Sequence, residues 1–149
     1  MTRYLPHLPA DLIEAALTRS PGNEVKSGKI DGPESSAALV ANGFGFFLNR
    51  PGDLPPLPGV PMGPVTAVDL SAQMAFPWSG GRHPWLDVGI TTDTTLIGIE
   101  SARYEPFRPA KATGFADVYD RPVWGTNMAR YTRLMHDLVA GNVGFQSLD

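Results

Sequence analysis

Two carboxylates stand at a spacing that could serve chemistry. Asp87 and Glu100 flank a stretch in which two β-rich runs surround the polar segment 91–95. Such a pattern predicts a β-hairpin. If Asp93 and Thr94 form a two-residue turn, Asp87 and Glu100 lie directly opposite each other on one face of the hairpin. Their Cβ atoms would then be about 4.5–5.5 Å apart.

Like charges in this position destabilise a sheet, so something must offset their repulsion. A raised pKa on one carboxyl group, a neighbouring cation or a bound metal ion would each do so. Oxygen ligands without His or Cys suit Mg²⁺, Mn²⁺ or Ca²⁺ better than Zn²⁺. The spacing alone is also compatible with two solvated carboxylates on an open sheet face.

The two faces of the predicted hairpin differ in character. One face is apolar and carries Leu86, Val88, Ile97 and Ile99. The acidic face carries Gly89 and Gly98 beside the carboxylates. Missing side chains at these glycines would let a ligand approach the backbone, so we expect the acidic face to be open.

Helices and a strand must position this hairpin. Apolar periodicity predicts helices over 9–19 and 33–48, and a strand over 65–75. Pro33 suits the first position of the second helix, and Glu34 suits the positive end of its dipole. That helix is apolar nearly all round, which predicts burial, with close packing as the reason for Gly43 and Gly45.

A third helix is predicted over 122–140, between Pro122 and Gly141. Apolar residues recur along it at spacings of three and four. They are Trp124, Met128, Tyr131, Met135 and Leu138. We expect this stripe to be core packing.

Composition limits the class of protein. The 149 residues predict a single domain, 1–149, and the uncapped end of the sequence suggests that it is incomplete at its C-terminus. Cysteine is absent, which excludes disulfides and thiolate sites. No apolar run approaches the roughly 20 residues that span a bilayer. The first residues lack the apolar core of a signal peptide, so a cytoplasmic location is expected.

Charge is unevenly distributed along the chain. The formal net charge is -3, which does not indicate a globally basic nucleic-acid binder. Half of the 12 basic residues nevertheless lie within 101–135. A solvated helix face and a phosphate-facing surface explain this stretch equally well.

The residues next to Asp87 and Glu100 match a known motif. Pro84-Trp85-Leu86-Asp87 and, further on, Glu100-Ser101-Ala102 resemble the motif of the PD-(D/E)XK nuclease superfamily. Flanking blocks are similar to a bacterial group of restriction-endonuclease-like proteins. These blocks lie at 21–24, 33–39, 98–101, 104–108 and 121–125, so the resemblance covers most of the chain.

This resemblance implies an α/β fold, a restriction-endonuclease-like central mixed sheet flanked by helices on both sides. It implies a nuclease in which Asp87 and Glu100 hold Mg²⁺ (or Mn²⁺) with the carbonyl of Ser101. Glu34 would be the additional acidic residue near the metal, although a simple charge at the helix N-terminus explains it as well.

One position departs from the superfamily motif. A lysine belongs two residues after Glu100, where this chain has Ala102. Lysine would orient or deprotonate the attacking water and offset phosphate charge, and alanine can do neither. Arg103 is no plain substitute, because neighbouring strand residues point to opposite faces. The resemblance offers Lys111 as a hypothesis for the catalytic lysine, reaching in from the following loop as migrated lysines do elsewhere in the superfamily.

Two functional classes follow from these observations. The first is a Mg²⁺-dependent deoxyribonuclease whose activity Ala102 impairs, acting on DNA in the cytoplasm without membrane attachment. The second is an inactive relative that binds nucleic acid or a protein partner without cutting. A homodimer is an open alternative for its assembly. The residues expected to contact nucleic acid are Arg82, Arg103, Arg108 and Lys111.

Overall fold

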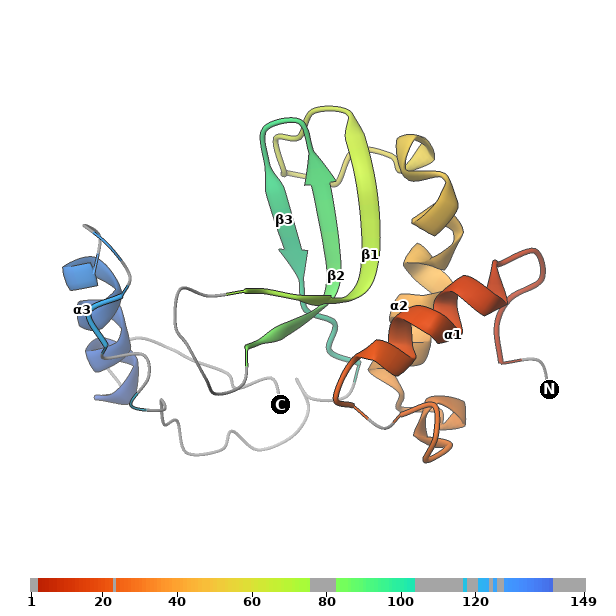
Figure 1. Cartoon of the computed structure of the whole chain (residues 1–149), viewed down its shortest axis with the longest axis horizontal. Helices are drawn as coiled ribbons and strands as arrows, with labels where there is room; N and C mark the ends of the chain where they lie inside the picture. The colour runs from red at the N-terminus through yellow and green to blue at the C-terminus, as the bar shows by residue number, and fades with distance from the viewer. Residues whose placement is uncertain are drawn as a thin grey trace. The chain divides into compact units, whose positions relative to one another are not determined.

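The protein is described from a computed structural model, shown in Figure 1. It describes residues 3–22, 24–75, 83–103, 117, 121–123, 125 and 128–140. The chain forms two compact units. One unit joins Met1–Met74 to Pro84–Tyr104, and the other joins Ala75–His83 to Glu105–Asp149. That the two units together form the single domain 1–149 stays a prediction.

The first unit contains a three-stranded antiparallel sheet. Its strands are β1 (Val65–Gln73), β2 (Trp85–Thr92) and β3 (Leu96–Ile99), in the order β1-β2-β3. The predicted hairpin is confirmed, because β2 and β3 are joined through Asp93 and Thr94. The backbone N–H of Thr92 donates to the carbonyl of Thr95 at 2.9 Å and closes the turn.

Two α-helices pack on this sheet. Helix α1 (Ala10–Arg19) contacts β1, and helix α2 (Ser36–Phe44) contacts β1 and β2 (Figure 1). The core between helices and sheet contains apolar residues at alternate strand positions, as a sheet with one covered face requires. Its largest fully buried side chains are Ile13, Ile30, Leu70, Val88 and Ile90. The helix predicted over 9–19 is therefore confirmed. Ile13, Ala16 and Leu17 of its apolar stripe are buried, whereas Leu12 is 46% exposed.

The second helix begins later than predicted. The hydroxyl oxygen of Ser35 accepts the N–H of Ala38 at 3.0 Å, so Ser35 is the N-cap and Pro33 lies outside the helix. A serine N-cap satisfies one of the four unpaired N–H groups of the first turn, and this decides where the helix starts. The helix is also not buried all round, because Leu39 is 48% exposed.

The two glycines of this helical region differ. A Cβ atom at Gly45 would lie 2.5 Å from Cδ1 of Ile13, whereas one at Gly43 meets nothing within 4 Å. The close-packing explanation is confirmed for Gly45 and wrong for Gly43. The backbone continues as short 3₁₀ turns, η2 (Gly45–Asn49) and η3 (Pro51–Asp53). Another such turn, η1 (Lys29–Asp31), precedes α2.

The described sheet differs from the one implied by the resemblance. Its three strands are antiparallel throughout, where a mixed sheet was expected. An antiparallel meander is the direct result of short connections, because parallel neighbours need a long crossover. The structure thus establishes an α/β arrangement with an antiparallel sheet in the described part of the chain.

The second unit contains helix α3 (Met128–Val139). The helix begins six residues after Pro122, later than predicted. Its apolar stripe was expected to be core, but Tyr131 is 55% exposed and no residue of α3 is buried. The core prediction is therefore wrong for Tyr131, while Met128, Met135 and Leu138 are half-buried and Trp124 lies outside the described residues.

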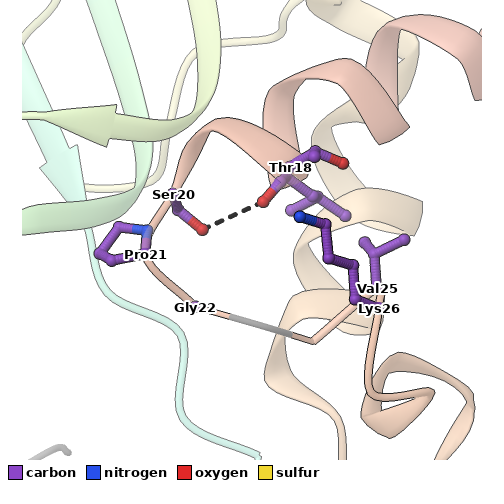
Figure 2. Close-up of a pocket in the computed structure, with 7 residues that line it drawn as sticks. Thr18, Ser20, Pro21, Gly22, Val25 and Lys26 are labelled. Atoms are coloured by element: carbon purple, nitrogen blue, oxygen red, sulfur yellow. Dashed lines mark hydrogen bonds between the residues drawn. The ribbon is translucent and has the colours of Figure 1, made fainter.

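A pocket lies where α1 ends and the following loop begins (Figure 2). It encloses about 320 Å³. The hydroxyl of Ser20 donates to the carbonyl of Leu17 at 3.1 Å and closes the helix end beside it. The lining residues are Leu17, Thr18, Ser20, Pro21, Gly22, Val25 and Lys26. None of the predicted site residues is among them.

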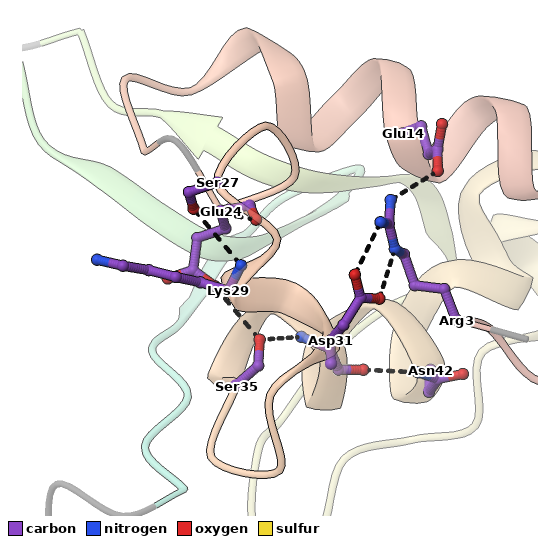
Figure 3. Close-up of polar contacts among 9 residues, drawn as sticks. Arg3, Glu14, Glu24, Ser27, Lys29, Asp31, Ser35 and Asn42 are labelled. Atoms are coloured by element: carbon purple, nitrogen blue, oxygen red, sulfur yellow. Dashed lines mark hydrogen bonds and ion pairs between the residues drawn. The ribbon is translucent and has the colours of Figure 1, made fainter. Parts of the chain in front are cut away.

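Arg3 ties the beginning of the described chain to two other segments (Figure 3). Its Nε and Nη2 donate to the two carboxylate oxygens of Asp31 at 2.8 and 3.0 Å. Its Nη1 donates to Oε1 of Glu14 at 3.1 Å. The hydrogen bond from Arg3 holds the pKa of Asp31 below its ordinary value. The guanidinium group thus fixes the N-terminal segment to α1 and η1.

Candidate functional site

The two carboxylates occupy corresponding positions on neighbouring strands. Asp87 lies in β2, and Glu100 directly follows β3. The last ladder pair of these strands is Val88 with Ile99. Asp87 and Glu100 are therefore the next two positions along the same register. The predicted register is confirmed by the structure.

The electrostatics of Glu100 agree with this placement. Partial burial raises the pKa of its carboxyl group above the ordinary value, and the negative charge of Asp87 raises that pKa further. Glu100 as a whole residue is nevertheless exposed, while Asp87 is half-buried. Water therefore screens part of the repulsion. The pair carries an electrostatic cost that a cation or a proton would relieve.

Asp87 is also held by the backbone beyond β3. The N–H of Ser101 donates to Oδ2 of Asp87 at 2.6 Å. Hydrogen bonds to a charged carboxylate are shorter and stronger than neutral ones. This bond holds Ser101 against β2 after the strand ladder has ended. This hydrogen bond was not predicted from the sequence, although the register that pairs Asp87 with Glu100 also brings Ser101 close to Asp87.

Side chains of the protein lie close to both glycines of the hairpin. A Cβ atom at Gly98 would lie 2.5 Å from Cδ1 of Leu86, and one at Gly89 would lie 2.8 Å from Cβ of Ala72. Leu86 was expected on the opposite, apolar face, and the glycines were expected to admit a ligand. The expectation for Leu86 is wrong, and the expectation of an open glycine is wrong for Gly89, which is buried, whereas Gly98 is exposed. The space beside each glycine is already occupied by the protein's own side chains.

A backbone irregularity accompanies this arrangement. Ser71 in β1 has a φ of 52°, in the left-handed region that non-glycine residues rarely adopt. It precedes Ala72, and Ala72 is paired with Leu86. Regular alternation of side chains along a strand assumes extended backbone at every residue. Ser71 interrupts that alternation next to Ala72 and Leu86, the pair whose side chains lie beside the two glycines.

The N-terminus of α2 contacts the segment that follows Glu100. The hydroxyl oxygen of Ser36 accepts the backbone N–H of Arg103 at 3.2 Å. The preceding residue, Ser35, is buried and donates its hydroxyl to Oε2 of Glu24 at 3.3 Å (Figure 3). The sequence predicted neither of these two hydrogen bonds, because each joins residues that are not neighbours in the chain.

The remaining predicted residues fall into two groups. Glu34 is exposed and lies just before the N-cap of α2, and Arg103 is exposed with its backbone bound to Ser36. Ala102, at the motif's lysine position, is half-buried. Three predicted residues lie outside the described part of the chain. They are Arg82, Arg108 and Lys111.

The described residues limit how a metal ion could be held. Within them, no group of three or more His, Asp or Glu side chains is arranged to hold a metal ion. Glu34 is therefore not gathered with Asp87 and Glu100 into such a group. Mg²⁺, however, commonly uses only one or two carboxylates and keeps several waters. Two carboxylates and a backbone carbonyl are oxygen donors that fit this ion.

Comparisons with known proteins add no relative. No family model matches the chain, and neither does any curated protein or any solved structure. Across the part of the chain that is described, no helix has both the length and the apolar character needed to cross a membrane.

Proposed function

We propose that Asp87 and Glu100 bind a divalent cation, Mg²⁺ or Mn²⁺, in a nuclease-like protein that acts on DNA phosphodiester bonds. The observation that carries this proposal is the pair of carboxylates at adjoining positions of β2 and β3, where each disfavours the charge of the other. A divalent cation would convert this repulsion into attraction to a shared ion.

Each residue of the site has a defined part in this proposal. Asp87 and Glu100 would supply carboxylate oxygens, and Ser101 would supply its carbonyl. The N–H of Ser101 keeps the Asp87 carboxylate in one orientation through its 2.6 Å hydrogen bond. When bound, the metal would stabilise negative charge on a phosphate and favour ionisation of a water molecule.

Ala102 limits the expected rate. Its methyl group cannot donate a hydrogen bond or carry charge, so it cannot assist a water molecule or a phosphate oxygen. Groups that perform these tasks are worth about 10²-fold or more in rate. Lys111 is the residue proposed to supply the missing ammonium group. We therefore propose a weak deoxyribonuclease rather than an efficient one.

The proposed nuclease function implies a restriction-endonuclease-like fold. A restriction-endonuclease-like fold is supported by a β-hairpin with its two acidic residues on neighbouring strands, in a sheet that contacts α1 through β1 and α2 through β1 and β2.

Metal binding is the first test. Free Mn²⁺ can be counted by electron paramagnetic resonance for the parent protein, Asp87→Asn and Glu100→Gln. Each substitution should weaken Mn²⁺ binding by at least about tenfold, the smallest loss typical of changes around a metal. Asp69→Asn is the matched control, because Asp69 is an exposed carboxylate on β1. Equal Mn²⁺ binding by all four proteins would refute the metal site.

Plasmid cleavage is the second test. In Mg²⁺ or Mn²⁺, Ala102→Lys should cut DNA about 10²-fold faster than the parent. Lys111→Ala should remove the residual activity of the parent. If Lys111→Ala leaves that activity unchanged, the assignment of Lys111 is wrong.

The alternative function is a module that binds nucleic acid or a protein partner without cutting. Ala102 is the specific observation that favours it. Fluorescence anisotropy with a labelled DNA duplex distinguishes the two functions when combined with the cleavage assay. DNA binding without cleavage by either the parent or Ala102→Lys would select the non-cutting function.

A further inference from the structure

The segment from Glu100 to Arg103 is held at two points beyond the strand ladder. The ladder of β3 ends at Ile99. After it, the N–H of Ser101 binds Asp87, and the N–H of Arg103 binds Ser36. The first contact joins the segment to β2, and the second joins it to α2.

We infer that Ser36 is a positioning residue for the acidic pair. Its hydroxyl oxygen holds the end of this segment on the N-terminus of α2, so that Glu100 and Ser101 stay beside Asp87. The effect of Ser36 on a metal ion rests on the proposed function, whereas its effect on the position of residues 100–103 does not.

The anchor itself is well fixed. Ser36 is the first residue of α2, and the preceding Ser35 is only 7% exposed. The Ser35 hydroxyl accepts the N–H of Ala38 at 3.0 Å and donates to Glu24 at 3.3 Å. Helix α2 also contacts β2, the strand that carries Asp87. The hydroxyl of Ser36 is thus attached to the same framework as one member of the acidic pair.

The position of the contact explains its importance. Between the segment's two held amides lie the carbonyl of Ser101, a proposed metal ligand, and Ala102, the position of the motif's lysine. Loss of the Ser36 hydroxyl would remove the contact between Arg103 and α2, while the bond from the N–H of Ser101 to Asp87 would still join the segment to β2. Residues that orient ligands without touching the metal typically contribute 10–100-fold to metal affinity.

The experiment compares three variants of the full chain. Ser36→Ala removes the acceptor, and Ser36→Thr restores a hydroxyl. Ser20→Ala is the control, because it deletes a serine hydroxyl that binds a helix carbonyl at the end of α1. Alanine is well accepted inside a helix, so Ser36→Ala should still fold. Two quantities are measured: amide hydrogen exchange of Ser101 and Arg103 by NMR, and Mn²⁺ affinity.

Ser36→Ala should speed exchange at both amides and weaken Mn²⁺ binding by about tenfold. Ser36→Thr and Ser20→Ala should keep the parent values of both. The inference is overturned if Ser36→Ala matches Ser20→Ala in Ser101 exchange and, for a parent that binds Mn²⁺, in affinity. If the parent binds no Mn²⁺, the proposed metal site fails, and the exchange of Ser101 still decides the role of Ser36.

Discussion

At the scale of single residues, the main feature is a carboxylate whose ionisation works against folding. Burial and the charge of Asp87 both raise the pKa of Glu100. The native state therefore binds this proton more tightly than the unfolded state does. As pH rises through the ordinary pKa to the raised pKa, ionisation of Glu100 reduces the free energy of unfolding. Below the ordinary pKa this penalty is absent.

Glu100→Gln should therefore stabilise the metal-free protein at neutral pH. The expected gain is about 0.2–1 kcal/mol, the size of a cross-strand pair interaction. The gain should disappear in acid below the ordinary pKa of Glu. Thermal unfolding in the presence of a chelator, at several pH values, measures this difference.

Mg²⁺ should reverse the order of stability. At a concentration tenfold above Kd, a ligand stabilises the native state by about 1.4 kcal/mol. The parent protein should gain this amount, and Glu100→Gln should gain much less. Asp69→Asn serves as the control for a general loss of charge. A parent that is no more stable with Mg²⁺ than without it would count against the metal site.

At the scale of elements, the contact between α1 and η2 depends on one missing side chain. Gly45 leaves space for Ile13, which is fully buried and cannot move into solvent. Adding a methyl group at Gly45 overfills this contact. Gly43, in contrast, faces open space.

Gly45→Ala should destabilise the protein by about 1–3 kcal/mol, as overpacking does. Gly43→Ala should stabilise it by about 0.5–1 kcal/mol, because alanine favours a helix and restricts the unfolded chain. Chemical denaturation of both variants checks this pair of opposite effects.

Ile13→Val provides a further control for this contact, because valine lacks the Cδ1 atom that the new methyl group would meet. The double variant Ile13→Val with Gly45→Ala should lose less stability than the sum of the two single variants. Strict additivity would show that the α1–η2 contact does not set the requirement for glycine.

At the scale of the whole molecule, the N-terminal segment adds a pH dependence of opposite sign. Arg3 holds the pKa of Asp31 below its ordinary value through two hydrogen bonds. The stability that this pair contributes is present above the ordinary pKa of Asp31. It is lost as pH falls through the lowered pKa.

Arg3→Gln should therefore reduce stability most at neutral pH, and the difference from the parent should shrink in acid. Thermal unfolding between about pH 2 and pH 7 measures this convergence. Arg19→Gln, a change at another exposed arginine, should leave the titration of Asp31 unchanged. An unaltered Asp31 pKa in Arg3→Gln would contradict the role given to Arg3.

The assembly of the molecule stays a prediction. Sedimentation of the full chain would show whether it is a monomer or the homodimer considered above. DNA as a partner and a cytoplasmic location are likewise proposals from the residues. The same sample can be used for the DNA-binding measurement.

The sequence by itself determined the hairpin and its register. A two-residue turn and a side-chain period of two leave little freedom in which residues face each other, so Asp87 and Glu100 were paired correctly. It also located α1, whose apolar stripe has a clear helical period. Each of these features depends on residues close together in the chain.

Only the tertiary structure decided what surrounds the carboxylates. Leu86 covers Gly98, and Ser36 binds Arg103 across 67 positions of the chain. Ser71, next to the residue paired with Leu86, has left-handed backbone, and no repeat of residue types in the sequence predicts this conformation. Long-range contacts and local departures from regular backbone depend on the packing of the whole unit. For this reason the sequence predicted the acidic pair but not the residues that hold and enclose it.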